Sequence, residues 1–285
     1  MPPAPLSSLD DILDRYDALL CDVWGVIHNG RARYADACAA LERARAAGKR
    51  VILITNVPKP RDPIPGQLER IGVPRAAWDA IVTSGDAIRE ELRARAPGPM
   101  YKIGPESDAS LWEGLGLQRS ELGAARFIAI SGLNDDSRET PEDYAGMLRE
   151  ARARDLELVC ANPDIVVQWG DRLLWCAGAI ARDYAAIGGR VVMAGKPHAP
   201  IYDAAYRELQ KLTGGAPDKA RILAIGDGIG TDVRGAAAQG IDCLFVASGT
   251  HGENLHTAGA LDLAKVNAAL AGEGVSCRYA MSALA

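Results

Sequence analysis

Short apolar runs alternate along this chain with longer stretches that are rich in alanine, leucine, arginine and glutamate. The apolar runs occupy residues 18–23, 50–55, 80–82, 190–194, 221–225 and 241–247. Helical stretches are expected at residues 34–47, 199–212 and 231–239. Continuous apolar runs followed by helices are typical of parallel strands that are buried on both faces. The pattern therefore predicts an α/β fold with a doubly wound parallel sheet.

The pattern of residues 87–176 differs from this alternation of apolar runs and helical stretches, and the segment is predicted to be an inserted α/β domain. Its strands are expected at residues 100–103, 126–130, 157–160 and 165–169. The remaining residues, 1–86 and 177–285, would then form the core domain. The insert carries the net charge of the whole chain, with 16 acidic and 11 basic residues, and such an excess is typical of a solvated helical surface.

Composition excludes several classes of protein. Of the 285 residues, 48% are hydrophobic and 24% are charged, which is ordinary for a globular protein and not for a disordered or collagen-like chain. The net charge of −5 provides no basic surface for nucleic acid or for an anionic membrane, so neither partner is expected.

The longest apolar run, residues 173–181, is too short to span a bilayer. The six cysteines contain no C-x-x-C pair, which predicts buried free thiols.

The N-terminal segment has no basic start and carries several aspartates where a signal peptide would be apolar. Export is therefore not indicated, and a cytoplasmic location is expected.

Polar side chains follow the predicted strands at the points where those strands end. They are Asp22, Thr55, Asn56, Lys196, Asp227 and, slightly further on, Asp232. In an open α/β sheet, ligands bind beyond the carboxyl ends of the strands. An acidic nucleophile, a hydroxyl group, a lysine and a second acidic cluster can hold a phosphoryl group beside a divalent metal ion. Asp22 and Asp227 supply the carboxylate oxygens that Mg²⁺ prefers.

Four short motifs contain these residues, in the order D-x-x-G-V from Asp22, T-N from Thr55, G-K-P around Lys196 and G-D-x-x-x-T-D around Asp227. Together they closely resemble the motifs of the haloacid dehalogenase superfamily of phosphatases, and the resemblance covers nearly the whole chain. The long insert and the phrase ANPD at residues 161–164 resemble the NagD-type class. That class has a Rossmann-like core and a large α/β cap.

The resemblance implies a Mg²⁺-dependent phosphatase that acts on a small phosphomonoester, such as a sugar phosphate or a nucleotide. Asp22 would be the nucleophile and form an aspartyl-phosphate. The groups implied to hold the phosphoryl group are Thr55, Asn56 and Lys196. The implied Mg²⁺ ligands are Asp22, the backbone carbonyl of Trp24, and Asp227. Asp232 would orient metal-bound water or Lys196, and a homodimer would be expected.

Trp24 is a departure from the family pattern. Phosphatases of the family usually have a second aspartate two residues after the nucleophile, where it acts as general acid and then as base. An indole cannot supply that proton, and loss of a general acid or base typically lowers the rate by about 10²–10⁴. A histidine, His28 or His198, is a candidate replacement, although His28 in a turn is more typically exposed. The alternative is a protein that binds a phosphometabolite with little or no turnover.

Two further features have competing interpretations. The sequence Gly226-Asp-Gly-Ile-Gly230 resembles a dinucleotide-binding turn, but Thr231 stands where the third glycine is required, so an NAD-dependent oxidoreductase is not favoured. In the insert, residues 162–164 are expected to face the substrate. Trp169 and Trp175 could do the same, although packing within the insert is the preferred interpretation for both tryptophans.

Overall fold

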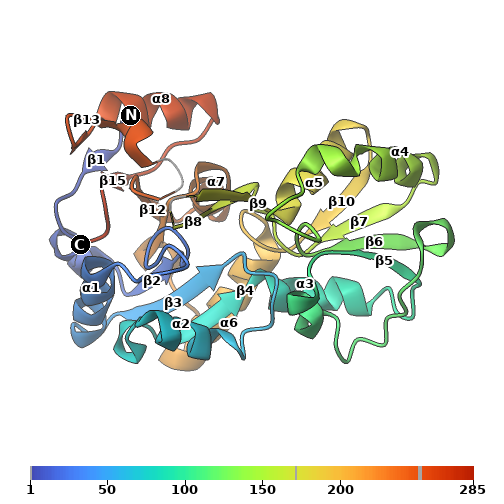
Figure 1. Cartoon of the computed structure of the whole chain (residues 1–285). Coiled ribbons are helices and arrows are strands. Elements are labelled where there is room, and N and C mark those ends of the chain that lie inside the picture. Colours follow the sequence, from blue (N-terminus) through green and yellow to red (C-terminus); the bar gives the residue numbers. More distant parts are fainter. Residues whose placement is uncertain (1, 171, 250–251) are drawn as a thin grey trace.

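The structure is a computed structural model that describes residues 2–170, 172–249 and 252–285. Two parallel sheets lie side by side, each with its own helices (Figure 1). The N- and C-terminal parts of the chain build the larger sheet, and the middle of the chain builds the smaller one. None of the described helices is long and apolar enough to cross a membrane.

The larger sheet has seven parallel strands in the order β1-β15-β12-β11-β2-β3-β4. Their bounds are β1 Ala4–Pro5, β2 Ala18–Cys21, β3 Arg50–Thr55, β4 Ala80–Thr83, β11 Ile222–Gly226, β12 Asp242–Val246 and β15 Tyr279–Met281. The strands predicted at residues 18–23, 50–55, 80–82, 221–225 and 241–247 all belong to this sheet. The predicted doubly wound parallel sheet is therefore confirmed.

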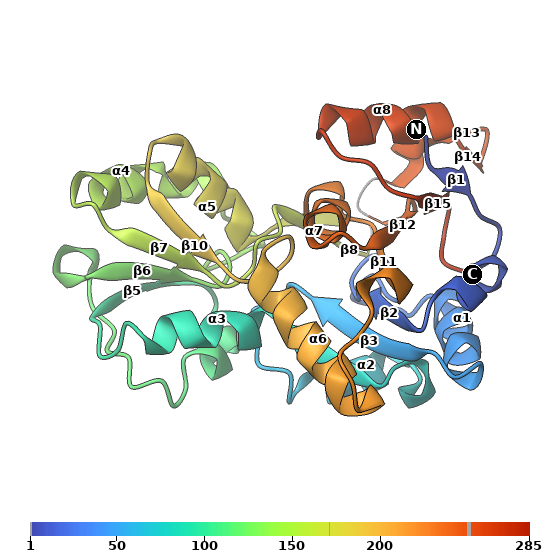
Figure 2. The same ribbon diagram turned by 180° about the vertical axis from the view of Figure 1, so that it is seen from behind.

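Helices cover both faces of the larger sheet, which explains why its strands are apolar throughout. The helices α1 (Ala35–Ala46) and α2 (Ile64–Ile71) pack on one face, where Leu19 and Leu53 point. On the other face, seen in Figure 2, lie α6 (Ala199–Thr213), α7 (Arg234–Gln239) and α8 (Leu263–Gly272), against Leu20 and Ile52. Alternate side chains of one strand thus enter two separate apolar cores.

The smaller sheet has the order β10-β7-β6-β5, and all of its pairs are parallel. Its strands are β5 Met100–Ile103, β6 Phe127–Ile130, β7 Glu157–Cys160 and β10 Arg190–Met193. Its helices are α3 Ser84–Arg93, α4 Ala145–Ala153 and α5 Ala177–Ala186. We call this part the cap. An antiparallel hairpin of β8 (Val166–Trp169) and β9 (Arg172–Trp175) extends from the cap toward the larger sheet (Figure 1).

The cap is longer than the predicted segment of residues 87–176. Strand β10 was expected to belong to the core, yet its Val191 pairs with Leu158 of β7 in the smaller sheet. Helix α5 also packs in the cap, where Ile180 and Tyr184 are buried. The predicted boundary at residue 177 is therefore wrong for these two elements. An apolar run indicates a buried strand, but it does not indicate which of two sheets the strand joins.

A second antiparallel pair, β13 (His256–Thr257) and β14 (Ala260–Leu261), lies near α8 in the core. The six cysteines are free, and all except Cys277 are buried. The predicted buried thiols are thus confirmed for five of the six positions.

Candidate active site

The carboxyl ends of three adjacent strands bring the predicted polar residues together. Asp22 directly follows β2, Thr55 ends β3, and Asp227 directly follows β11. Strand β2 lies between β3 and β11 in the sheet, so their ends lie next to one another. Asp22, Thr55 and Asp227 are all buried. The convergence that the sequence predicted is therefore present at this edge of the sheet.

Lys196 lies at the centre of this group as a buried cation. Its Nζ is 2.6 Å from Oδ1 of Asp22 and 2.7 Å from Oδ1 of Asp232. Its backbone N–H donates to Oδ1 of Asn56 at 2.8 Å. Gly195 is required beside it, because a Cβ there would lie 2.5 Å from the same Asn56 oxygen. These contacts fix the lysine between the nucleophile candidate and a second carboxylate.

Burial and neighbouring charges shift the pKa values of this group. Burial raises the pKa of Asp22, an effect that Lys196 opposes and the charge of Asp232 increases. Burial by itself lowers the pKa of Lys196, but the charges of Asp22 and Asp232 outweigh it and raise the pKa. Lys196 therefore keeps its positive charge, which suits a site that must hold an anionic phosphoryl group.

Three carboxylates at this edge fit a divalent cation. Oxygens of Asp22, Asp227 and Asp232 all lie within 4.8 Å of one another. Gly25, with a φ of +87°, lets the loop after β2 approach closely, since a Cβ there would lie 2.4 Å from Oδ2 of Asp227. Clustered carboxylate oxygens are ligands that Mg²⁺ and Ca²⁺ prefer. Asp232 has a second role, because its Oδ1 binds Lys196 and its Oδ2 accepts the backbone N–H of Gly228 at 3.0 Å.

The turn that resembled a dinucleotide-binding motif serves this cluster instead. Strand β11 ends at Gly226, and a Cβ at that position would lie 2.1 Å from the carboxyl carbon of Asp232. The glycine therefore makes room for a carboxylate of the site, and the following turn runs into a π-helix at Ile229–Val233. This geometry accounts for the glycine without a dinucleotide.

Asp164 of the cap reaches the same edge of the core. Its Oδ1 accepts a hydrogen bond from Nδ2 of Asn56 at 2.8 Å, and its backbone N–H donates to Asn162 at 3.0 Å. Burial raises the pKa of Asp164 to about 6. Asp22, Thr55, Asp164, Asp227 and Asp232 line one small cavity of about 160 Å³, which we call the inner cavity. The ANPD segment thus faces the site, as the sequence predicted.

Trp24 holds the cap hairpin. Its indole Nε1 donates a hydrogen bond to the backbone carbonyl of Gln168 in β8, and its ring lies 5.5 Å from that of Trp169. The backbone N–H of Gly170 donates to the carbonyl of Asn29 at 3.0 Å, which adds a second tie between hairpin and core. The indole N–H of Trp24 therefore already donates its hydrogen bond within the protein.

Trp169 and Trp175 do not pack the interior of the cap. They are 38% and 36% exposed, and both line a larger cavity of about 570 Å³ between cap and core, which we call the outer cavity. The preferred interpretation from the sequence is wrong for both. The short hairpin projects from the smaller sheet, so its tryptophans have no cap core to enter.

The two candidate histidines do not have the properties of a general acid. His28 is buried rather than exposed, and burial lowers its pKa to about 4, so it is neutral near pH 7. Its Nδ1 accepts the backbone N–H of Gly30 at 2.9 Å. His198 is the N-cap residue of α6 and, within the described part of the chain, lines neither cavity.

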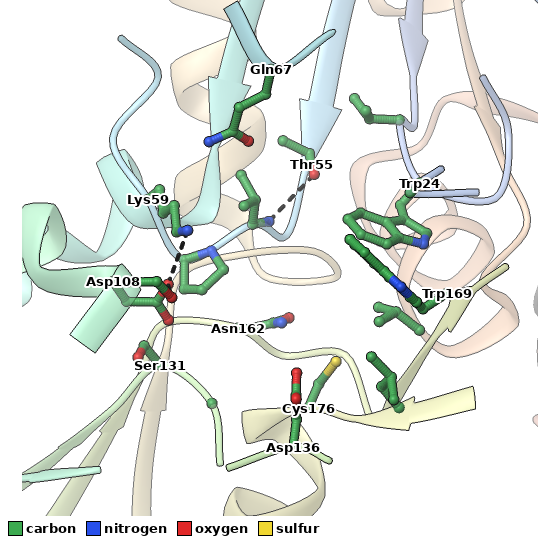
Figure 3. A pocket seen from close by; sticks show the side chains of 18 of the residues that line it. Trp24, Thr55, Lys59, Gln67, Asp108, Ser131, Asp136, Asn162, Trp169 and Cys176 are labelled. Carbon is green, nitrogen blue, oxygen red and sulfur yellow. Dashed lines mark hydrogen bonds and ion pairs between the residues drawn. The ribbon is translucent and has the colours of Figure 1, made fainter. Parts of the chain in front are cut away.

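Sequence reasoning missed several polar residues of the outer cavity. Lys59 and Asp108 form an ion pair there at 3.2 Å. The buried hydroxyl of Ser131 also lines it and has no hydrogen-bond partner among the described residues. Figure 3 shows these residues across the cavity from Trp24 and Trp169. No motif of the sequence marks them, because Lys59 lies in the core after β3, whereas Asp108 and Ser131 lie in the cap.

Comparisons with known proteins agree with this geometry. A model of the haloacid dehalogenase-like hydrolases matches residues 19–118, and a second model of similar hydrolases matches residues 193–269. A solved haloacid dehalogenase-like hydrolase from Brucella suis is 45% identical, with a TM-score of 0.87 over 100% of both chains. The chain belongs to the haloacid dehalogenase-like hydrolase family. Its expected place in the NagD class, as an enzyme with an inserted cap, is confirmed.

Two more distant members of the family are also similar to this chain. A 5'-nucleotidase of Bacillus subtilis is 25% identical over 82% of this chain and 88% of its own length. A glycerol phosphate phosphatase of Mycobacterium tuberculosis, solved with magnesium, shares the fold at 22% identity, with a TM-score of 0.62 over 90% of this chain and 77% of that chain. That structure contains a divalent metal ion, and the carboxylate cluster described above offers the oxygen ligands that such an ion prefers.

Proposed function

We propose that this hydrolase is a Mg²⁺-dependent phosphatase that cleaves small phosphate monoesters through an aspartyl-phosphate on Asp22. The observation that carries the proposal is the position of Asp22 Oδ1, 2.6 Å from Lys196 Nζ and within the cluster formed with Asp227 and Asp232. A carboxylate nucleophile beside a fixed cation and metal-binding oxygens suits phosphoryl transfer, which depends on positioning and charge stabilisation. The phosphatases among its relatives support the same activity.

In the proposed first step, an oxygen of Asp22 attacks phosphorus while the ester bond on the opposite side breaks. Lys196 and the hydroxyl of Thr55 hold the phosphoryl oxygens. The side-chain amide of Asn56 already binds Asp164 and the backbone of Lys196, so its part is to keep Lys196 in place. The Thr55 oxygen accepts the backbone N–H of Val57 at 3.3 Å, which leaves the hydroxyl hydrogen free to donate. Water then attacks the phosphorus of the aspartyl-phosphate and releases Asp22.

Mg²⁺, when bound, would offset the negative charge of the phosphoryl group and of the nearby carboxylates. Asp22, Asp227 and the backbone carbonyl of Trp24 would hold it. Asp232 would act behind these ligands by fixing Lys196, to which it is hydrogen bonded at 2.7 Å.

The decisive experiment measures phosphate release from a panel of phosphate monoesters, including 4-nitrophenyl phosphate, with Mg²⁺ and with EDTA. Asp22→Asn is expected to lower kcat by at least about 10³-fold, and EDTA is expected to abolish turnover. Asp203→Asn is the matched control, because Asp203 is exposed on α6 and lies outside the site. Activity that survives in Asp22→Asn would contradict the proposal.

The second candidate function is binding of a phosphometabolite without turnover. The observation in its favour is that Trp24, at the usual position of the general acid, has its only polar hydrogen bonded to Gln168. This function predicts that phosphate monoesters raise the melting temperature while no phosphate is released. The same panel therefore separates the two functions.

A further inference from the structure

When the phosphate monoester of an alcohol is cleaved, the departing oxygen needs a proton. An alkoxide is a poor leaving group without one, and a positioned acid typically contributes about 10²–10⁴ to the rate. Trp24 stands where phosphatases of the family usually have that acid, and its indole N–H donates to the backbone carbonyl of Gln168. The proton must therefore come from another side chain.

The departing oxygen would lie where the inner and outer cavities meet. Trp24, Thr55 and Val167 line both cavities. Phosphorus beside Asp22 would lie in the inner cavity of about 160 Å³, and the rest of the ester would extend into the outer cavity of about 570 Å³. A proton donor for this reaction must reach the place where the two cavities meet.

Among the described residues, three acidic side chains line the two cavities in addition to the carboxylate cluster around Asp22. Asp108 and Asp136 line the outer cavity, and Asp164 lines the inner one. Asp108 is paired with Lys59 at 3.2 Å, and the exposed Asp136 does not line the inner cavity. Asp164 is therefore the carboxyl group that shares a cavity with the nucleophile without belonging to the metal-binding cluster.

A chain of hydrogen bonds places Asp164 relative to the nucleophile. Its Oδ1 accepts Nδ2 of Asn56 at 2.8 Å, and Oδ1 of Asn56 accepts the backbone N–H of Lys196 at 2.8 Å. Nζ of Lys196 in turn donates to Asp22 at 2.6 Å. Among the described residues, only Oδ1 of the Asp164 carboxyl group has a hydrogen-bond partner. One oxygen thus fixes the group, and the other can carry a proton toward the leaving oxygen.

The segment that carries Asp164 is itself held on two sides. The backbone N–H of Gly178, in the first turn of α5, donates to the carbonyl of Asp164 at 3.0 Å. A Cβ at Gly178 would lie 2.4 Å from that carbonyl oxygen, so the close approach requires glycine. Strand β8 follows Asp164, and its Gln168 accepts the indole N–H of Trp24. Trp24 therefore lacks an acidic proton but holds the segment that brings a carboxyl group to the site.

The surroundings of Asp164 also favour its protonated form. Burial raises its pKa to about 6, and the charges of Asp232 and Asp227 act in the same direction. Lys196 and the hydrogen bond from Asn56 oppose this shift. A carboxyl group with this pKa is present in both protonation states near neutral pH, which suits a group that donates a proton and later accepts one.

We propose that Asp164 is the general acid and base of the phosphatase reaction, so that the cap supplies the group that the core lacks at position 24. This inference rests on the proposed phosphatase function and identifies its proton donor. It predicts that the enzyme cleaves phosphate monoesters of alcohols as well as those of more acidic hydroxyl compounds.

The proposed proton transfers balance over two steps. In the first, a carboxylate oxygen of Asp22 bonds to phosphorus, the bond from phosphorus to the ester oxygen breaks, and that oxygen leaves with the electron pair and the proton of Asp164. In the second, the Asp164 carboxylate removes a proton from water as the water oxygen bonds to phosphorus. The bond to Asp22 breaks, its electron pair returns to the carboxylate, and hydrogen phosphate leaves. Both side chains are then in their starting states.

The acidity of the leaving group tests Asp164 as an acid. Benzyl phosphate and 4-nitrophenyl phosphate are of similar size, but the first releases an alcohol and the second an acidic phenol. Asp164→Asn is expected to lower kcat/KM for benzyl phosphate by about 10²–10⁴ and to change that for 4-nitrophenyl phosphate by less than about tenfold, because 4-nitrophenolate leaves without a proton. Asp203→Asn, exposed on α6 and outside the site, is the control and should change neither value.

The second step tests Asp164 as a base. The value of kcat/KM reports the steps up to release of the phenol, whereas kcat also includes hydrolysis of the aspartyl-phosphate. Rapid mixing of Asp164→Asn with 4-nitrophenyl phosphate should therefore show a burst of about one 4-nitrophenolate per enzyme molecule, followed by slow turnover. A purely structural role for Asp164 predicts equal losses for both substrates and no burst.

Equal losses of kcat/KM for the two substrates in Asp164→Asn, or no loss for either, would overturn the inference and leave the phosphatase function in place. A selective loss in Asp136→Asn instead would assign the proton transfer to the outer cavity and also overturn it. The same holds for a wild type that releases 4-nitrophenol but no benzyl alcohol, because no acid would then act. Absence of any Asp22-dependent phosphate release would instead contradict the proposed function itself, and the role of Asp164 with it.

Discussion

The inner and outer cavities share three lining residues, Trp24, Thr55 and Val167, but the chemistry of their other lining residues differs. The inner cavity is lined by carboxylates at the ends of core strands, and a buried lysine pairs with two of them at 2.6 and 2.7 Å. The outer cavity is lined by aromatic and aliphatic side chains from a core loop, α2 and the cap hairpin. Carboxylates are concentrated where phosphoryl transfer is proposed, whereas the outer cavity combines tryptophan rings and aliphatic side chains with charged groups such as Lys59 and Asp108.

The residues of the inner cavity would therefore determine the rate of phosphoryl transfer, and those of the outer cavity would determine the choice of substrate. The groups of the inner cavity are fixed by strands and by hydrogen bonds to the backbone, such as Gly228 to Asp232. The groups of the outer cavity depend on how the cap hairpin meets the loop after β2, through Trp24 and Gln168. Changes in the first region should alter rates for all substrates, whereas changes in the second should alter the ranking of substrates.

The largest effect is expected where the two cavities meet. In an Asp164→Asn background, Trp24→Asp would place an ionisable carboxyl group beside the leaving oxygen and remove one aromatic wall. We expect kcat/KM for benzyl phosphate, relative to 4-nitrophenyl phosphate, to rise by about 10²–10⁴ over Asp164→Asn alone. The measured quantity is the ratio of these two kcat/KM values, because a loss of active protein lowers both equally and leaves the ratio unchanged. Trp24→Phe in the same background should keep the ratio of Asp164→Asn, and an unchanged ratio with Trp24→Asp would show that the position does not control acid catalysis.

A smaller effect on rate is expected from the inner cavity alone. Lys196→Met removes the buried cation but keeps a side chain of similar length. We expect kcat to fall by about 10²–10³ for 4-nitrophenyl phosphate and acetyl phosphate alike. Inhibition by 4-nitrophenol, which would occupy only the outer cavity, should stay at its wild-type value. If the variant changed the inhibition constant as strongly as kcat, the proposed independence of the two cavities would be wrong.

The smallest effect concerns the pH dependence of stability through Asp164. Burial raises its pKa to about 6, whereas an unfolded aspartate ionises near about 3.9. The protonated carboxyl therefore favours the folded state at low pH, and that stability is lost as the pH rises through the folded pKa. Relative to the wild type, Asp164→Asn should gain up to about 3 kcal/mol between about pH 4 and pH 7.

Urea unfolding at several pH values measures this difference, with Asp203→Asn as the control for an exposed aspartate. A difference that does not change with pH would show that Asp164 is well solvated and that the inner cavity is open to water. Asn56 can donate to an amide oxygen at position 164 as it does to the carboxylate, so the tie between cap and core is kept.

Much of the inner cavity could be predicted from the sequence. Asp22, Thr55 and Asp227 each follow or end an apolar run, and neighbouring parallel strands bring their ends to one edge. Lys196 was also predicted as a site residue. Its strand β10 was expected in the core sheet, however, whereas it pairs with β7 in the cap. The local pattern of a buried strand is the same in either sheet, so the residue was found while its domain was not.

The sequence by itself determined the parallel core and the charged groups at its strand ends, because hydrophobic periodicity and strand direction are local properties that any such sheet converts into one shared edge. Only the tertiary structure decided the role of Trp24 and the position of Trp169. Their contact, and the hydrogen bond from Trp24 to Gln168, join segments 144 residues apart in the chain. Contacts over that separation depend on how two domains meet, which no local pattern of residues specifies.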